Sequence, residues 1–89
     1  LFLISTLSFA NVNQTEKEAL IAIYNATNGK NWNSTWDLSQ SMDTWYGVTI
    51  ENDKIVELNL QFNNLQGTIP QELGNLLNLR KINLPFFSI

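Results

Sequence analysis

The strongest constraint on the fold is an internal repeat with a step of twenty-four residues in the second half of the 89-residue chain. At this step the sequence matches itself at aliphatic and asparagine positions: Ile55 with Leu79, Leu58 with Ile82, Asn59 with Asn83, and Leu60 with Leu84. A period of this length predicts a solenoid, in which each repeat forms one coil and buries its aliphatic side chains against the neighbouring coil.

Each repeat also contains an alternation that is typical of a short strand. Leu58 and Leu60 are expected to point inward, and residues 57, 59 and 61 outward, because side chains alternate along a strand. Stacking of two coils would place Glu57 beside Lys81 at about 4.8 Å, the usual distance between strands. Asn63 follows the strand, and its side-chain amide is expected to bond the backbone of adjacent coils.

The region before the repeat begins with a predicted helix over residues 16–26. Thr15 and Glu18 have the spacing of a capping box, in which a hydroxyl and a carboxylate bond the free backbone N–H groups at a helix start. Apolar or small residues then recur at three- and four-residue steps, namely Ala19, Leu20, Ile23, Tyr24 and Thr27. Asn28-Gly29 follows and favours a helix end, because both residues tolerate positive φ.

Residues 30–45 show no period but contain all three tryptophans, Trp32, Trp36 and Trp45. Burial of one such ring contributes roughly 1.5–3 kcal/mol, so the simplest interpretation is that they pack against the helix. The alternative is an exposed aromatic platform for a sugar ring.

A hairpin is predicted next, because alternating apolar residues flank the polar turn at residues 51–54. The residues that we expect to be buried in one core are Leu20, Ile23, Trp36, Val48, Leu58, Leu60, Leu65 and Leu73.

The segment 55–78 resembles the plant-type leucine-rich repeat almost position for position. The matching residues are the aliphatics Leu58, Leu60 and Leu65, the turn residue Asn63, the step Gly67-Thr68-Ile69-Pro70, and Leu73, Gly74 and Leu76. The upstream part looks like the N-terminal cap that precedes such repeats; its marks are Ala19-Leu20, residues 26–29, Trp32, Trp36 and residues 45–48. The cap of plant receptors usually carries paired cysteines, whereas this chain has none. The sequence is therefore closer in style to the cysteine-free caps of exported bacterial members.

The resemblance implies an α+β fold: a helical, tryptophan-rich cap over residues 11–54, followed by one to two coils of a right-handed solenoid. Repeat 1 covers residues 55–78. Residues 79–89 form an incomplete or degenerate second repeat, because Phe87 stands where the turn asparagine is expected. We expect the chain to be a fragment of a longer protein.

Residues 1–10 are uncharged and mostly apolar, and they end in Ser8-Phe9-Ala10. Small residues at positions 8 and 10 suit a signal peptidase, so these residues are predicted to be the last part of a signal peptide. The run is too short to span a bilayer, which takes roughly 20 apolar residues. The alternative is a buried N-terminal strand. The signal-peptide interpretation predicts a secreted or cell-envelope protein.

Composition excludes several kinds of chemistry. The net charge is −3, and the five cations are scattered, which argues against a nucleic-acid partner. Without cysteine or histidine the usual zinc ligands, thiolate nucleophiles and imidazole bases are missing. The spacing of Asp37, Asp43 and Asp53 does not resemble a calcium loop. We therefore expect no cofactor, no metal and no catalytic residues.

The resemblance implies binding through the concave sheet, and the candidate residues are Glu57, Asn59, Gln61, Lys81 and Asn83. The partner would be a protein or peptide, with a polysaccharide as the alternative. The plainer interpretation is that Glu57 and Lys81 are a solvated cross-strand pair of well under 1 kcal/mol. Two alternative functions of the chain stay open: it could be the sensor end of a larger receptor or enzyme, or a carbohydrate-binding module. Three triplets, at Asn13, Asn25 and Asn33, have the form of glycosylation acceptors.

Overall fold

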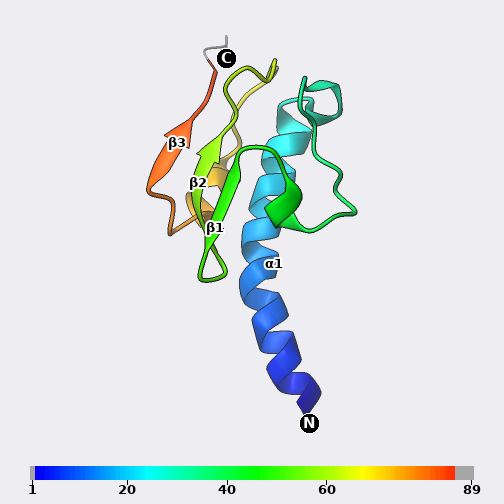
Figure 1. Ribbon diagram of the computed structural model, residues 1–89, viewed down its shortest axis with the longest axis vertical. Coiled ribbons are helices and arrows are strands. Elements are labelled where there is room, and N and C mark those ends of the chain that lie inside the picture. The colour runs from blue at the N-terminus through cyan, green and yellow to red at the C-terminus, as the bar shows by residue number, and fades with distance from the viewer. Residues whose placement is uncertain (1, 86–89) are drawn as a thin grey trace.

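The structure, a computed structural model, describes residues 2–85, with the side chains of residues 14–85. Within this part a long helix, α1 (Phe2–Ala26), lies beside a three-stranded sheet formed by β1 (Val48–Glu51), β2 (Lys54–Asn59) and β3 (Lys81–Asn83) (Figure 1). The connecting segments contain the short 3-10 helices η1 (Gly29–Asn31), η2 (Met42–Thr44) and η3 (Gln71–Asn75). One helix with a small sheet agrees with the predicted α+β class.

The sheet confirms both the hairpin and the repeat step. Strands β1 and β2 are antiparallel and are joined by Asn52 and Asp53 at φ 51° and 64°, the left-handed pair that a tight hairpin turn requires. Strands β2 and β3 are parallel, and Leu58 pairs with Ile82. The other pairs in this register are Glu57 with Lys81 and Asn59 with Asn83.

One hydrophobic core lies between α1, the sheet and the connecting loops. Its fully buried members include Leu20, Ile23, Leu58 and Leu60. Of the eight residues expected in the core, six are buried. The prediction is wrong for Val48 and Leu73, which are only partly buried although both pack against the core. Val48 belongs to the edge strand β1 and Leu73 to η3, so each has protein on one side only.

The helix begins earlier than predicted. It ends at Ala26, as expected, and Asn28 then adopts a left-handed conformation with φ 62° and ψ 48°. The predicted start near Glu16 is wrong, because α1 runs without interruption from Phe2. Residues 2–15 contain neither proline nor glycine, so nothing in the sequence stops the helix from continuing toward the N-terminus. The Glu18 carboxylate accepts a hydrogen bond from Gln14 Nε2 at 3.0 Å and does not cap the helix.

Glu16 has a structural role that the capping-box interpretation missed. Its side chain is buried, and Glu16 Oε1 accepts a 3.0 Å hydrogen bond from the backbone N–H of Ile55 in β2. This contact fastens the middle of α1 to the start of the first coil. Loss of the acceptor would leave a buried N–H without a partner, which costs about 1–3 kcal/mol.

We therefore expect Glu16→Ala to lower the free energy of unfolding by about 1–3 kcal/mol, measured as the urea midpoint followed by circular dichroism. Glu16→Gln is the matched control, because its amide oxygen can accept the same bond, and it should stay within about 0.5 kcal/mol of the parent. If both variants lost the same free energy of unfolding, the carboxylate charge, and not the hydrogen bond to Ile55, would be what stabilises the fold.

The first turns of α1 extend past the sheet (Figure 1). The side chains of residues 1–10 lie outside the described residues, so the signal-peptide prediction stays a prediction. None of the described helices is both long enough and apolar enough to cross a membrane.

Candidate binding surface

The outward face of the sheet carries the predicted binding residues. Asn59, Gln61 and Lys81 are exposed, and Glu57 and Asn83 are half-buried. Glu57 and Lys81 are register partners, as expected, but no ion pair forms between them. The ion pair that does form in residues 14–85 joins Arg80 to Glu51, with an N–O distance of 2.6 Å.

Backbone pairing extends the sheet beyond the ends of the strands. Asn59 N–H donates to Gly47 O at 2.8 Å, and Leu60 N–H donates to Asn83 O at 2.8 Å. The Asn59 side chain also accepts a 3.2 Å bond from the backbone N–H of Gln61. The amide groups on this face therefore project from a fixed backbone, which lowers the entropy lost on binding a partner.

The turn after β2 is held by a set of asparagine bonds that we call the asparagine clasp, between residues 31–34 and 62–64. Asn63 is 1% exposed; its Oδ1 accepts from Ser34 N–H at 2.7 Å and its Nδ2 donates to Ser34 O at 3.2 Å. Beside it, Asn64 Oδ1 accepts from Asn33 N–H at 2.9 Å, and Asn64 Nδ2 donates to Asn31 O at 3.1 Å. The prediction that the Asn63 amide bonds backbone groups is confirmed, but the predicted location in adjacent coils is wrong, because the partner is Ser34 in the loop that precedes the sheet.

The remaining repeat positions pack the first coil against α1. Leu65 and Leu76 are buried, while Ile69 and Pro70 are partly buried. Gly67 has φ 105°, and a Cβ there would collide with the carbonyl oxygen of Ala26. Glycine is therefore required by both conformation and space.

The tryptophans do not form a sugar platform, so that hypothesis is wrong. Trp32, Trp36 and Trp45 are each no more than 4% exposed. Their indole N–H groups donate to the carbonyl oxygens of Thr27, Tyr46 and Asp37, at 3.1, 2.8 and 2.9 Å respectively. The rings are therefore the core of the cap, as the simpler interpretation predicted.

Two exposed aromatic residues beside the sheet were not predicted as functional. Phe62 is 83% exposed and Tyr46 is 42% exposed. Tyr46 OH donates a long 3.4 Å bond to the carbonyl oxygen of Gln61, the residue before Phe62. An apolar residue outside the expected core was the signal that could have identified Phe62.

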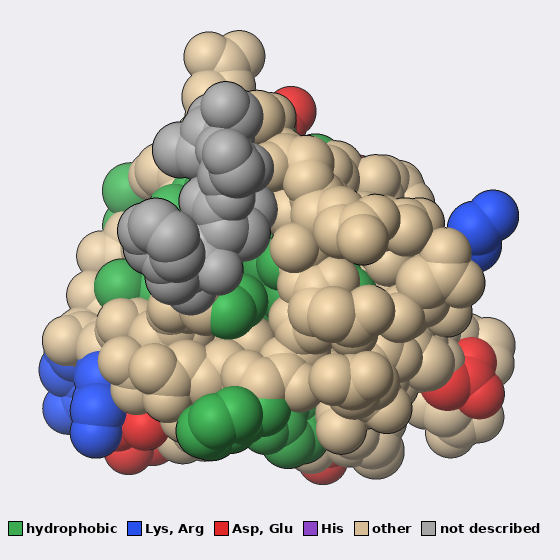
Figure 2. All heavy atoms as spheres, turned by 90° about the horizontal axis from the view of Figure 1, so that it is seen from above, with side chains coloured by type: hydrophobic (Ala, Val, Ile, Leu, Met, Phe, Trp, Pro, Cys, Tyr) green, Lys and Arg blue, Asp and Glu red, His purple; other side chains and the backbone are tan. Residues whose placement is uncertain are grey.

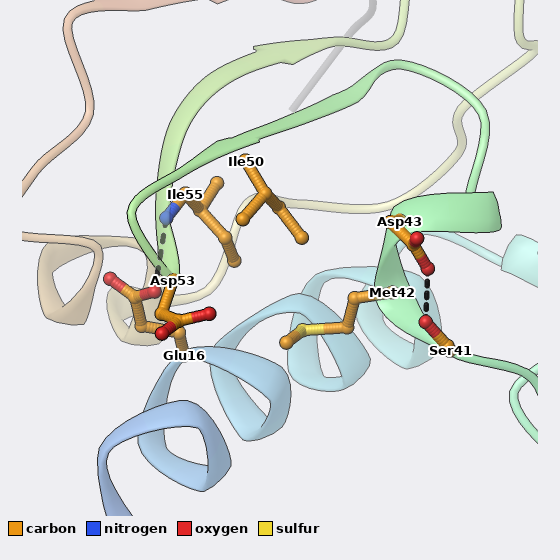
Figure 3. A pocket seen from close by; sticks show the side chains of 7 residues that line it. All are labelled: Glu16, Ser41, Met42, Asp43, Ile50, Asp53 and Ile55. Atoms are coloured by element: carbon orange, nitrogen blue, oxygen red, sulfur yellow. Dashed lines mark hydrogen bonds between the residues drawn. The ribbon is translucent and has the colours of Figure 1, made fainter. Parts of the chain in front are cut away.

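A cavity of about 280 Å³ lies between α1 and the hairpin (Figure 3). Three carboxylates, those of Glu16, Asp43 and Asp53, line it together with Ile50 and Ile55. Two of the carboxylates are already engaged, Glu16 by Ile55 and Asp43 by the hydroxyl of Ser41. Among the described residues, no three carboxylates are grouped so that they could hold a metal ion.

The structure also bears on the other residues considered in the sequence, namely Asp37 and the three asparagine triplets. Hydrogen bonds from the Ser39 hydroxyl and then from its backbone N–H lower the pKa of Asp37. In the triplet at Asn33, the side-chain amide donates to Phe62 O at 2.8 Å and belongs to the clasp. The triplet at Asn25 lies in the last turn of α1 with its side chain exposed, and the side chain of Asn13 lies outside the described residues.

No family model matches the sequence, and no curated protein matches it. The chain does match solved structures. A leucine-rich repeat protein from Bacteroides eggerthii matches 82% of the chain with a TM-score of 0.75 and 28% identity. A leucine-rich repeat protein from Bacteroides thetaiotaomicron matches 83% with a TM-score of 0.76 and 23% identity.

The fold is therefore that of a leucine-rich repeat protein: an α+β cap joined to a repeat coil. Both similar structures are of bacterial proteins. The chain spans only 13% and 11% of the length of these two structures.

Proposed function

We propose that the chain is the cap and first coil of an exported binding scaffold, whose sheet face contacts a protein or peptide. The observation that carries the proposal is the outward face of the sheet. There Asn59 and Asn83 lie side by side in register, and the side chains of Gln61 and Lys81 are exposed. Leucine-rich repeat neighbours with the same local fold support it.

Binding, and not catalysis, is the role that we assign to these residues. The five candidate residues are polar and are exposed or partly buried on this face, and the buried polar groups serve to hold the turn and the cap. The scaffold could form the sensor end of a larger receptor or enzyme, since the similar structures are several times longer than the chain. Export is part of the proposal; N-terminal sequencing of the mature protein, expected to begin at Asn11, tests it.

The experiment uses a display library of gene fragments from the source organism, selected against the 89-residue chain. Affinities of the selected fragments are then measured for the variant Gln61→Arg with Asn83→Arg, which places two bulky cations on the sheet face. We expect binding at least about tenfold weaker, because interface energy is concentrated in a few central side chains.

Glu72→Arg is the matched control, because Glu72 is exposed on η3 and lies outside the candidate face. Its affinities should equal those of the parent chain. Fragments that bind the sheet-face variant as tightly as the parent would overturn the proposed surface, since they must contact the chain elsewhere.

A further inference from the structure

Phe62 is the most unusual residue of the described surface. Its φ is 66°, in the left-handed region, and its side chain is 83% exposed. The other non-glycine residues with positive φ in residues 2–85 are Asn28, Asn52 and Asp53, types that tolerate this region well. A phenylalanine gains nothing from this backbone conformation and nothing from contact with water.

The strained conformation is held in place by neighbouring bonds. Asn33 Nδ2 donates to the carbonyl oxygen of Phe62 at 2.8 Å, and the buried Asn63 follows directly. The asparagine clasp thus fixes the backbone on the C-terminal side of Phe62. On its N-terminal side, Gln61 N–H donates to Asn59 and Gln61 O accepts from Tyr46. Strain that the surroundings enforce at an exposed position motivates the hypothesis that Phe62 has a functional role.

The chemistry around Phe62 is uncharged. The side chains of Tyr46, Asn59, Gln61, Asn64 and Asn83 are hydroxyl or amide groups. In the paired segments of β2 and β3 the ionisable residues are Glu57 and Lys81, which are register partners without an ion pair. On the face seen in Figure 2, hydrophobic side chains gather near the centre and at the lower edge, and the charged side chains lie at the edges, in part beside the lower hydrophobic group. A charged group brought to Phe62 would lose water without gaining a counter-charge.

We propose that Phe62, with Tyr46 beside it, is the apolar anchor of the sheet face, and that it takes an uncharged peptide segment carrying an aliphatic or aromatic side chain. The phenyl ring has no polar group, so its contribution comes from apolar area removed from water. An apolar side chain offers more such area than a hydroxyl-rich sugar. The side-chain amides of Asn59 and Gln61 supply the donors and acceptors that complement peptide groups. This inference rests on the proposed function and names its partner class.

The test uses immobilised random nonapeptides, pooled by one fixed central residue, and the fluorescently labelled 89-residue chain. Pools with central leucine or phenylalanine should retain at least about tenfold more chain than pools with central glutamate or lysine. Phe62→Asn should reduce this preference to background. Asparagine suits positive φ, so the same variant should raise Tm by about 4–8 °C, which separates loss of binding from loss of folding.

Leu77→Asn is the matched control, because Leu77 is 84% exposed and lies beside the β1–β2 hairpin turn rather than beside Phe62; it should keep the peptide preference. Three results would overturn the anchor: no preference among the pools, a preference that Phe62→Asn retains, or Phe62-dependent binding to a glycan array in place of the peptides. In each case, loss of fragment binding in the variant Gln61→Arg with Asn83→Arg would still support the proposed function on its own.

Discussion

Replacing Leu60 with alanine should cost roughly 2–5 kcal/mol of the free energy of unfolding, enough to leave much of the chain unfolded at room temperature. Leu60 is 0% exposed and is the second inward leucine of the coil. Its truncation would leave a cavity between the sheet and α1 that the surrounding side chains cannot fill. Native domains are stable by only about 5–15 kcal/mol, and small ones lie at the low end. The measurement is urea unfolding followed by circular dichroism.

Leu77→Ala is the control with the same change of side chain. Leu77 is 84% exposed, so its truncation should change the free energy of unfolding by less than about 0.5 kcal/mol. If both variants unfolded at the parent's urea concentration, the inward position of Leu60, and with it the register of the coil, would be wrong.

Replacing Trp36 with alanine should cost roughly 3–5 kcal/mol. Trp36 is the centre of the aromatic cluster: its ring stacks on Trp45 at 4.9 Å and 13°, and meets Trp32 edge-on at 5.0 Å. Tyr24 stacks on it from another side at 6.1 Å. The variant also leaves the Tyr46 carbonyl without its indole donor. Thermal unfolding, followed by near-ultraviolet circular dichroism of the remaining rings, measures the loss.

Trp36→Phe separates the two contributions, because it keeps a ring in the stack and removes only the hydrogen bond and part of the area. We expect it to cost about 1–3 kcal/mol, clearly less than alanine. An alanine variant that melts at the parent's temperature would contradict the placement of Trp36 at the centre of the cap core.

The repeat half of the fold could be predicted because its signal is periodic. The twenty-four-residue step alone predicts the pairing of Leu58 with Ile82 and of Asn59 with Asn83, since a parallel stack has little freedom of register. The start of α1 could not be predicted in the same way. A capping box at Thr15 and Glu18 is a local signal, and a helix continues through it when no residue upstream interrupts the backbone.

The candidate site was predicted only in part for a related reason. Alternation along β2 identifies Asn59 and Gln61 as outward residues, because it depends on the strand alone. Phe62 lies where the strand turns, and its conformation depends on Asn33, a residue twenty-nine positions earlier. No local pattern contains that contact. The same holds for Glu16, whose partner Ile55 is thirty-nine positions away.

The asparagine clasp also bears on the order in which the chain folds. Its bonds join residues that are 29 to 33 positions apart, so the turn of the first coil closes only onto a cap loop that has already formed. Contacts of this range are slow to form and are gained late. During synthesis the cap leaves the ribosome first, with its ring cluster complete by Tyr46. We infer that the first coil completes the core of the N-terminal part as it emerges, because α1 and the ring cluster share one core with Leu58 and Leu60.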